Sequence, residues 1–155
     1  MAYRFKLQVL LNYRQNLEEQ AQLRLGREQR LLLDQIARLE ELGERRRSVV
    51  ADFERRKRQP FDSAVFSLYL ETIATIDGDS ERQRRTIEAQ KRTVEEARRE
   101  LLARRQERKI MDRLRQQDFD RYRGEEQRRE FAAGDEQAVL RFGRGESLNG
   151  FGGET

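Results

Sequence analysis

Apolar residues recur along this chain at steps of three and four residues, and this spacing restricts the folds open to it. Such a heptad pattern places the apolar side chains in one stripe along a helix and is typical of coiled coils. In the first segment, residues 4–58, the stripe comprises Leu7, Leu10, Arg14, Leu17, Ala21, Leu25, Gln29, Leu32, Ile36, Leu39, Gly43, Arg46, Val50 and Phe53. The extra step of four from Ala21 to Leu25, which gives three successive steps of four from Leu17 to Gln29, predicts one stutter that locally unwinds the supercoil.

A second long segment, residues 80–140, repeats the pattern. Its stripe comprises Ile87, Gln90, Val94, Ala97, Leu101, Arg104, Arg108 and Met111. Ser80 and Gln83 have the spacing of a capping box, so we expect this helix to begin there. Upstream, residues 61–76 carry apolar side chains at helical spacing and predict a short helix, and Asp77-Gly78-Asp79 predicts the turn that ends it.

The composition agrees with long helices and excludes several classes of protein. The chain is 40% charged and only 35% apolar, and it lacks the near-continuous apolar strands of an α/β core. Without histidine or cysteine it has no imidazole base, thiol nucleophile, disulfide or usual zinc ligand set. No phosphate-binding loop or complete calcium loop is present either, so we expect no enzymatic activity, cofactor or metal.

Folding the two segments back on each other buries both stripes, so the sequence predicts an all-α, long antiparallel two-helix coiled-coil hairpin with a short connecting helix. Residues 1–142 would form this single domain. A turn centred near residue 69 would place Leu7 opposite Phe131 and Ile36 opposite Leu102. Residues 143–155 are rich in glycine and are expected to form a disordered tail.

Two features of the surface remain after this assignment. Near the N-terminus, Tyr3, Phe5, Val9 and Tyr13 exceed what a two-stranded seam uses; they either thicken that end or are offered to another protein. Basic residues also cluster, for example at Arg45–Arg47 and Arg55–Arg58. Acidic residues interleave with them and no aromatic stacking platform accompanies them, so an acidic protein or solvent explains them better than nucleic acid.

The N-terminal block YRFKLQVLLNYR, residues 3–14, resembles the N-terminal signature of the FliJ family of flagellar type III export chaperones. The segment FSLYLETI, residues 66–73, is similar to the middle motif of that family. Its C-terminal half is matched by Glu107-Arg108-Lys109, Arg113-Leu114, Tyr122, Asp135-Glu136 and Ala138. The resemblance spans residues 2–142.

The resemblance implies a non-enzymatic protein similar in architecture to the central stalk of rotary ATPases. Its implied partners are the flagellar export ATPase, the cytoplasmic domain of the export gate membrane protein, and substrate chaperones. By the family pattern, Phe5, Leu7, Leu10, Leu11 and Arg14 would face the ATPase, and Tyr69 and Ile73 would be candidates for the gate contact. We expect a cytoplasmic protein held at the inner membrane of the flagellar base by its partners, because no apolar run is long enough to cross a bilayer.

Three other interpretations stay open at this point. The chain could serve as the equivalent stalk of a virulence type III secretion system, as a generic structural coiled-coil scaffold that self-associates through the same stripes, or as a nucleic-acid-binding coiled coil.

Overall fold

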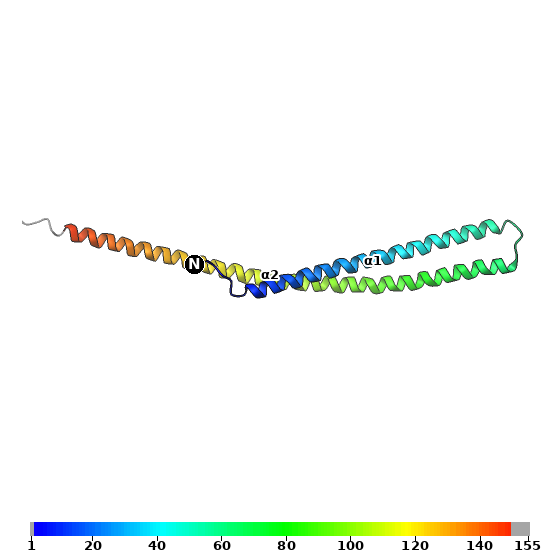
Figure 1. Ribbon diagram of the computed structural model, residues 1–155, viewed down its shortest axis with the longest axis horizontal. Coiled ribbons are helices and arrows are strands. Elements are labelled where there is room, and N and C mark those ends of the chain that lie inside the picture. The colour runs from blue at the N-terminus through cyan, green and yellow to red at the C-terminus, as the bar shows by residue number, and fades with distance from the viewer. Residues whose placement is uncertain (1, 150–155) are drawn as a thin grey trace, which may run out of the picture. The chain divides into compact units, whose positions relative to one another are not determined.

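The computed structural model describes residues 2–149, and the side chains of residues 2–145. It contains two helices, α1 (Gln8–Arg56) and α2 (Ser63–Asn149), joined by residues 57–62. The two helices run in opposite directions and pack against each other as a hairpin (Figure 1). The all-α hairpin fold predicted from the heptad spacing is therefore confirmed.

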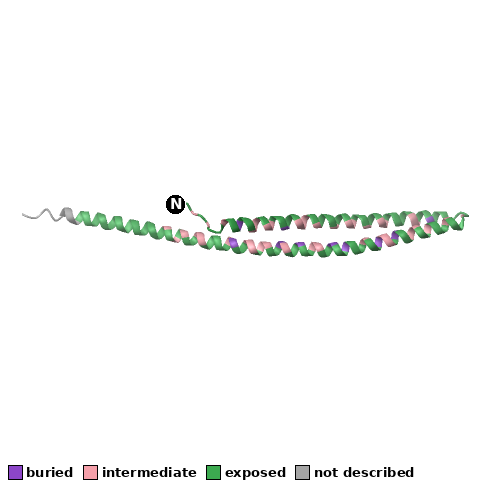
Figure 2. Ribbon diagram, turned by 60° about the horizontal axis from the view of Figure 1, so that its bottom comes forward, coloured by how far each residue is buried: buried purple, intermediate pink, exposed green. Residues whose placement is uncertain are grey.

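The seam between the helices explains why they pair. Within residues 14–106 its buried side chains are Ala21, Phe53, Ile76, Ser80, Ile87, Gln90, Ala97 and Leu101. In α2 these residues belong to a stripe that runs without interruption from Phe66 through Tyr69, Ile73, Ile76, Ser80, Gln83, Ile87, Gln90, Val94 and Ala97 to Leu101. The buried and partly buried residues lie on the facing sides of the two helices (Figure 2).

The expected short connecting helix and the expected turn at Asp77-Gly78-Asp79 are wrong, because α2 passes through both. None of the described glycines has a positive φ, so Gly78 does not need the conformation that only glycine tolerates. Ser80 is not the N-cap residue of a helix, because it lies buried in the middle of α2. Gln83 does not close a capping box: its side chain donates a hydrogen bond of 2.8 Å to the Gln35 carbonyl of α1.

The chain reverses instead around Pro60, which has no backbone N–H for a helical hydrogen bond. Asp62 starts α2, because its carboxylate accepts a hydrogen bond of 3.4 Å from the Ala64 N–H. The true register follows from ion pairs between the helices: Arg46 Nε lies 2.6 Å from Asp77 Oδ1, and Arg24 Nη1 lies 2.5 Å from Glu100 Oε2.

This register corrects three further expectations. The turn is not centred at residue 69, so Ile36 does not face Leu102. Gln35, the residue before Ile36, instead accepts the hydrogen bond from Gln83. Leu7 does not pair with Phe131, whose side chain is 76% exposed. The stutter in α1 stays a prediction, since Leu17, Ala21 and Leu25 are all buried or partly buried; after Leu25, the partly buried residue is Glu28 in place of the predicted Gln29.

The chain groups into two compact units, residues Arg14–Gln106 and, separately, the residues up to Tyr13 together with those from Glu107 on. The single domain over residues 1–142 stays a prediction. Of the expected disordered tail, residues 143–149 belong to α2, and the remainder lies outside the described residues. Among the described residues, no helix has the length and apolar content that a bilayer crossing requires.

Candidate partner-binding surfaces

The N-terminal arm, residues 2–7, is anchored by Tyr3. The Tyr3 ring packs on Phe119, with centroids 5.1 Å apart, and on Tyr122, with centroids 5.3 Å apart. Its hydroxyl donates a hydrogen bond of 2.9 Å to Asp118 Oδ2. Partial burial, and then the neighbouring Asp118 carboxylate, raise the pKa of Tyr3. Tyr3 therefore thickens this unit, as one of the two expectations for the N-terminal aromatic residues proposed.

The end of the N-terminal arm and the start of α1 carry an apolar face that the rest of this unit leaves uncovered, which we call the N-terminal face. It comprises Leu7, Val9, Leu10 and Tyr13, whose exposed fractions are 44%, 83%, 38% and 55%. Val9 and Tyr13 are thus offered to solvent and match the second expectation. The sequence indicates this exposure, because Val9 and Tyr13 are one helical turn apart and both lie outside the heptad stripe.

The residues proposed for the ATPase contact occupy different environments. Leu7 and Leu10 are exposed and Phe5 is partly buried. Leu11 is completely buried, because the stripe in this part of α1 is shifted by one residue from the predicted Leu10. Arg14 belongs to the other compact unit, where it is partly buried and engaged in an interaction.

Residues 127–145 of α2 are all exposed, as Figure 2 shows. Its large apolar side chains Phe131, Val139, Leu140 and Phe142 are 76%, 70%, 64% and 78% exposed. A helix with no packed face gains little from tertiary burial, which normally supplies most of helical stability in proteins. The apolar side chains of this segment therefore form a second exposed apolar surface.

At the opposite end of α1, an aromatic cluster holds the bend together. Phe53 packs on Phe66 and Tyr69, with centroids 5.4 and 5.3 Å apart, and Phe61 stacks on Phe66 at 6.1 Å. The Tyr69 hydroxyl donates a hydrogen bond of 2.7 Å to Asp52 Oδ2, and this bond, followed by partial burial, raises the pKa of Tyr69.

The two gate candidates, Tyr69 and Ile73, are both partly buried against α1. Their exposed neighbours are Phe66, Leu68 and Leu70, with exposed fractions of 39%, 62% and 47%. The heptad spacing did not predict a functional role for Leu68, because Leu68 lies outside the stripe. The sequence could have indicated it only through its position next to Tyr69, an aromatic residue packed in the bend. The bend thus offers apolar side chains on a rigid aromatic support.

None of these surfaces has the features of a catalytic centre. No group of histidine, cysteine or carboxylate side chains within the described residues is arranged to hold a metal ion. The described residues present apolar and charged helical faces, and exposed apolar faces of this kind are features of proteins that bind other macromolecules.

The comparison with known families identifies the class more closely. Residues 3–147 match the model of the flagellar FliJ protein, and the chain therefore belongs to the FliJ family. It is a non-enzymatic component of the flagellar export apparatus. The family resemblance of the N-terminal block and middle motif is thus confirmed across almost the whole chain. No curated protein and no solved structure matches it.

Proposed function

We propose that this chain is the stalk-like subunit of the flagellar export ATPase, that it promotes assembly and activity of the ATPase, and that it connects the ATPase to the export gate and to substrate chaperones. The observation that carries the proposal is the N-terminal face, where four large apolar side chains are exposed beside an arm that is already ordered by Tyr3. Such pre-ordering favours binding, because little conformational freedom is lost when a partner covers the face.

Within this face, Leu7 and Leu10 are the proposed anchors and Phe5 supports them from the arm. Val9 and Tyr13 extend the same surface. Leu11 acts through packing, since a completely buried side chain has no area left to present to a partner. The two paired helices would form the stalk. Because the chain belongs to a family of the flagellar export apparatus, the export ATPase is the partner that we propose to test.

The test is a calorimetric titration of the full chain with its cognate export ATPase, together with the rate of ATP hydrolysis. The double variant Leu7→Ala/Leu10→Ala should weaken binding by about tenfold or more, because a covered leucine contributes about 1.5–3 kcal/mol. Leu23→Ala/Leu33→Ala removes two leucines that are 67% and 66% exposed in mid-helix, and it should leave both readouts unchanged. Equal affinities for the two double variants would overturn the assignment.

For the gate, we propose that the bend segment around Tyr69 and Ile73 makes the contact, with Leu68 and Leu70 as the exposed side chains that a partner covers. Leu68→Ala/Leu70→Ala should abolish binding to the isolated cytoplasmic domain of the gate protein and keep binding to the ATPase. Loss of both interactions together would show that the substitution acts through folding, and the bend would lose this role.

A further inference from the structure

The end of α1 at the bend carries four consecutive basic residues, Arg55, Arg56, Lys57 and Arg58, which we call the basic bend. Gln59, Pro60 and Phe61 follow, so no acidic side chain occurs from residue 55 to residue 61. Basic residues at a helix C-terminus interact favourably with the helix dipole. That effect fades beyond the last turn, whereas the basic run continues past the last helical residue, Arg56.

The basic bend has more positive charge than its neighbours neutralise. Arg55 lies 3.4 Å from Asp52 and Lys57 lies 3.4 Å from Glu54, in weak and exposed ion pairs. Arg56 and Arg58 have no ion-pair partner in the part of the chain that the structure describes, and both are exposed. By contrast, Arg46 and Arg24 in the seam are each paired with a carboxylate of α2.

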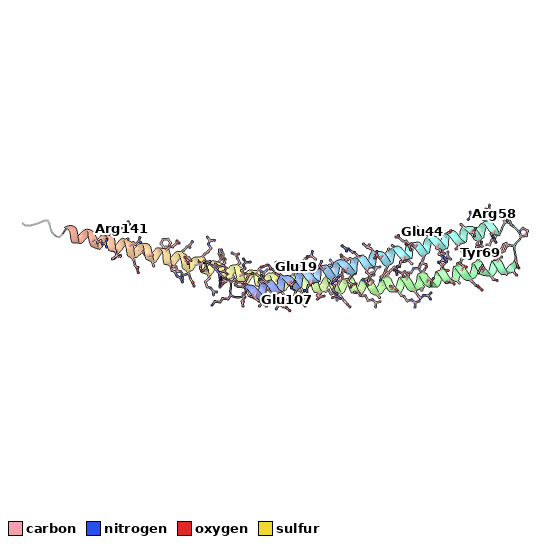
Figure 3. All side chains as sticks on the ribbon, viewed as in Figure 1. Glu19, Glu44, Arg58, Tyr69, Glu107 and Arg141 are labelled. Carbon is pink, nitrogen blue, oxygen red and sulfur yellow. The ribbon has the colours of Figure 1, made fainter. Side chains whose placement is uncertain are left out.

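The four side chains also spread around the end of the helix. The Lys57 N–H donates to the Phe53 carbonyl at 3.0 Å and the Arg58 N–H to the Arg55 carbonyl at 3.4 Å, so the chain continues to coil past α1. Consecutive residues of such a coil point about 100° apart. Figure 3 labels Arg58 at this bend. A peptide or helix partner contacts residues on one face, at spacings of three and four, and would leave some of these charges unused.

Apolar side chains accompany the charges. Phe61 is partly buried in the loop and stacks on Phe66, which is itself 39% exposed, and Leu68 is 62% exposed. The Lys57 ammonium lies 4.6 Å from the centroid of the Phe53 ring, so the cluster also holds one of the cations in place. Basic residues next to exposed Phe and Leu are the composition of segments that lie at membrane interfaces.

We propose that the basic bend binds the surface of an anionic lipid membrane end-on. A plane of diffuse negative charge accepts cations that point in several directions, which one face of a protein helix does not. Each basic residue close to an anionic membrane raises binding about fivefold, so a cluster of four gives reversible attachment that salt weakens. The inference stands independently of the ATPase proposal, and it shares the bend, Leu68 included, with the proposed gate contact.

The experiment is co-sedimentation of the full chain with vesicles of phosphatidylglycerol and phosphatidylcholine in equal amounts, and with vesicles of phosphatidylcholine alone. Binding is expected to the anionic vesicles only. Arg56→Gln/Arg58→Gln should reduce the partition coefficient by roughly 10- to 30-fold at low ionic strength. The matched control is Arg45→Gln/Arg47→Gln, which also removes two exposed arginines that have no ion pair among the described residues, and it should retain most of the binding.

Three results would overturn the proposal. One is the absence of binding to anionic vesicles. Another is an equal loss for the two double variants, which would show that overall charge alone is responsible. The third is competition by soluble polyglutamate, added at the same concentration of negative charge as the lipid. If polyglutamate releases the chain from the vesicles and binds it as tightly as the vesicles do, the basic bend recognises an acidic protein instead of a lipid surface.

Discussion

Individual residues in the seam show how this hairpin selects one register. Gln90 is 92% buried, and its Nε2 donates to the Glu28 carbonyl at 3.0 Å and to the Glu28 carboxylate at 2.6 Å. Gln83 makes the equivalent bond to the Gln35 carbonyl. Polar residues in a coiled-coil seam reduce stability but fix the register, because any shift leaves them buried without partners. The buried Gln35 Oε1 atom has no hydrogen-bond partner among the described residues, which is one such cost.

Ile76 is the residue whose truncation should destabilise the hairpin most clearly. Only 1% of its surface is exposed, and it lies between the bend cluster and the polar layers of the seam. Ile76→Ala should lower the free energy of unfolding by about 2–4 kcal/mol, through lost burial and the cavity left behind. Urea titration followed by circular dichroism measures this change. Leu33→Ala, at a position 66% exposed, should change it by less than about 0.5 kcal/mol.

The hydrogen bond between Tyr69 and Asp52 should make stability sensitive to alkaline pH. Because the pKa of Tyr69 in the folded chain is raised above its ordinary value of 10.0, the folded state holds the phenol proton more tightly than the unfolded state does. The resulting stabilisation is complete below about pH 10 and is lost as the pH rises through the folded-state pKa.

Thermal unfolding across this range tests the effect. Tyr69→Phe should be less stable than the parent chain at neutral pH and should lose less of its stability above pH 10. Tyr13→Phe, at an exposed position without a hydrogen bond among the described residues, should follow the parent chain. The same alkaline slope in both variants would contradict a role for the Tyr69 bond.

At the scale of the element, α2 was only partly predictable from the sequence. The spacing of Ile87, Gln90, Val94 and Ala97 identified the seam, and the hairpin followed from having two such stripes. Asp77-Gly78-Asp79, however, has the local composition of a turn. A glycine inside a helix costs only about 1 kcal/mol, and packing of Ile76 and Ser80 against α1 exceeds that preference.

The same comparison applies to the candidate surfaces. Val9 and Tyr13 are exposed because they lie off the stripe, which the sequence shows directly. The burial of Leu11 in place of Leu10 depends on how α1 is rotated about its axis, and a run of adjacent apolar residues does not specify that rotation. The bend position was available from Pro60, but the turn-like residues downstream shifted the predicted centre.

Gly78 gives a direct test of the continuous helix. A Cβ atom there would meet only the Arg82 Nη1 atom, at 4.0 Å, and the backbone has no positive φ. Gly78→Ala should therefore raise the free energy of unfolding by about 0.5–1 kcal/mol, and chemical denaturation measures it. Gly43 is another helical glycine at which an added Cβ atom would have similar room, so Gly43→Ala should raise the free energy of unfolding by a similar amount. If residues 77–79 formed a turn that required glycine, the Gly78 variant would instead be less stable.

At the scale of the whole molecule, the chain concentrates its aromatic residues in separate regions. None occurs at residues 14–52 or 70–118. One group surrounds Tyr3 and Phe119, another surrounds the bend, and both are packed into clusters with exposed apolar neighbours. The intervening seam is built from aliphatic and polar side chains, which suits a rigid connector.

The burial pattern of the seam depends on the register of the hairpin, and distances between spin labels measure this register most directly. The chain has no cysteine, so labels can be placed at any chosen pair. Labels at positions 24 and 100 should lie within about 20 Å, since paired helix axes are 8–10 Å apart. Labels at positions 36 and 102 should be separated by about 30 Å along the axis, because Gln35 meets Gln83. A short distance for the second pair and a long one for the first would contradict the register.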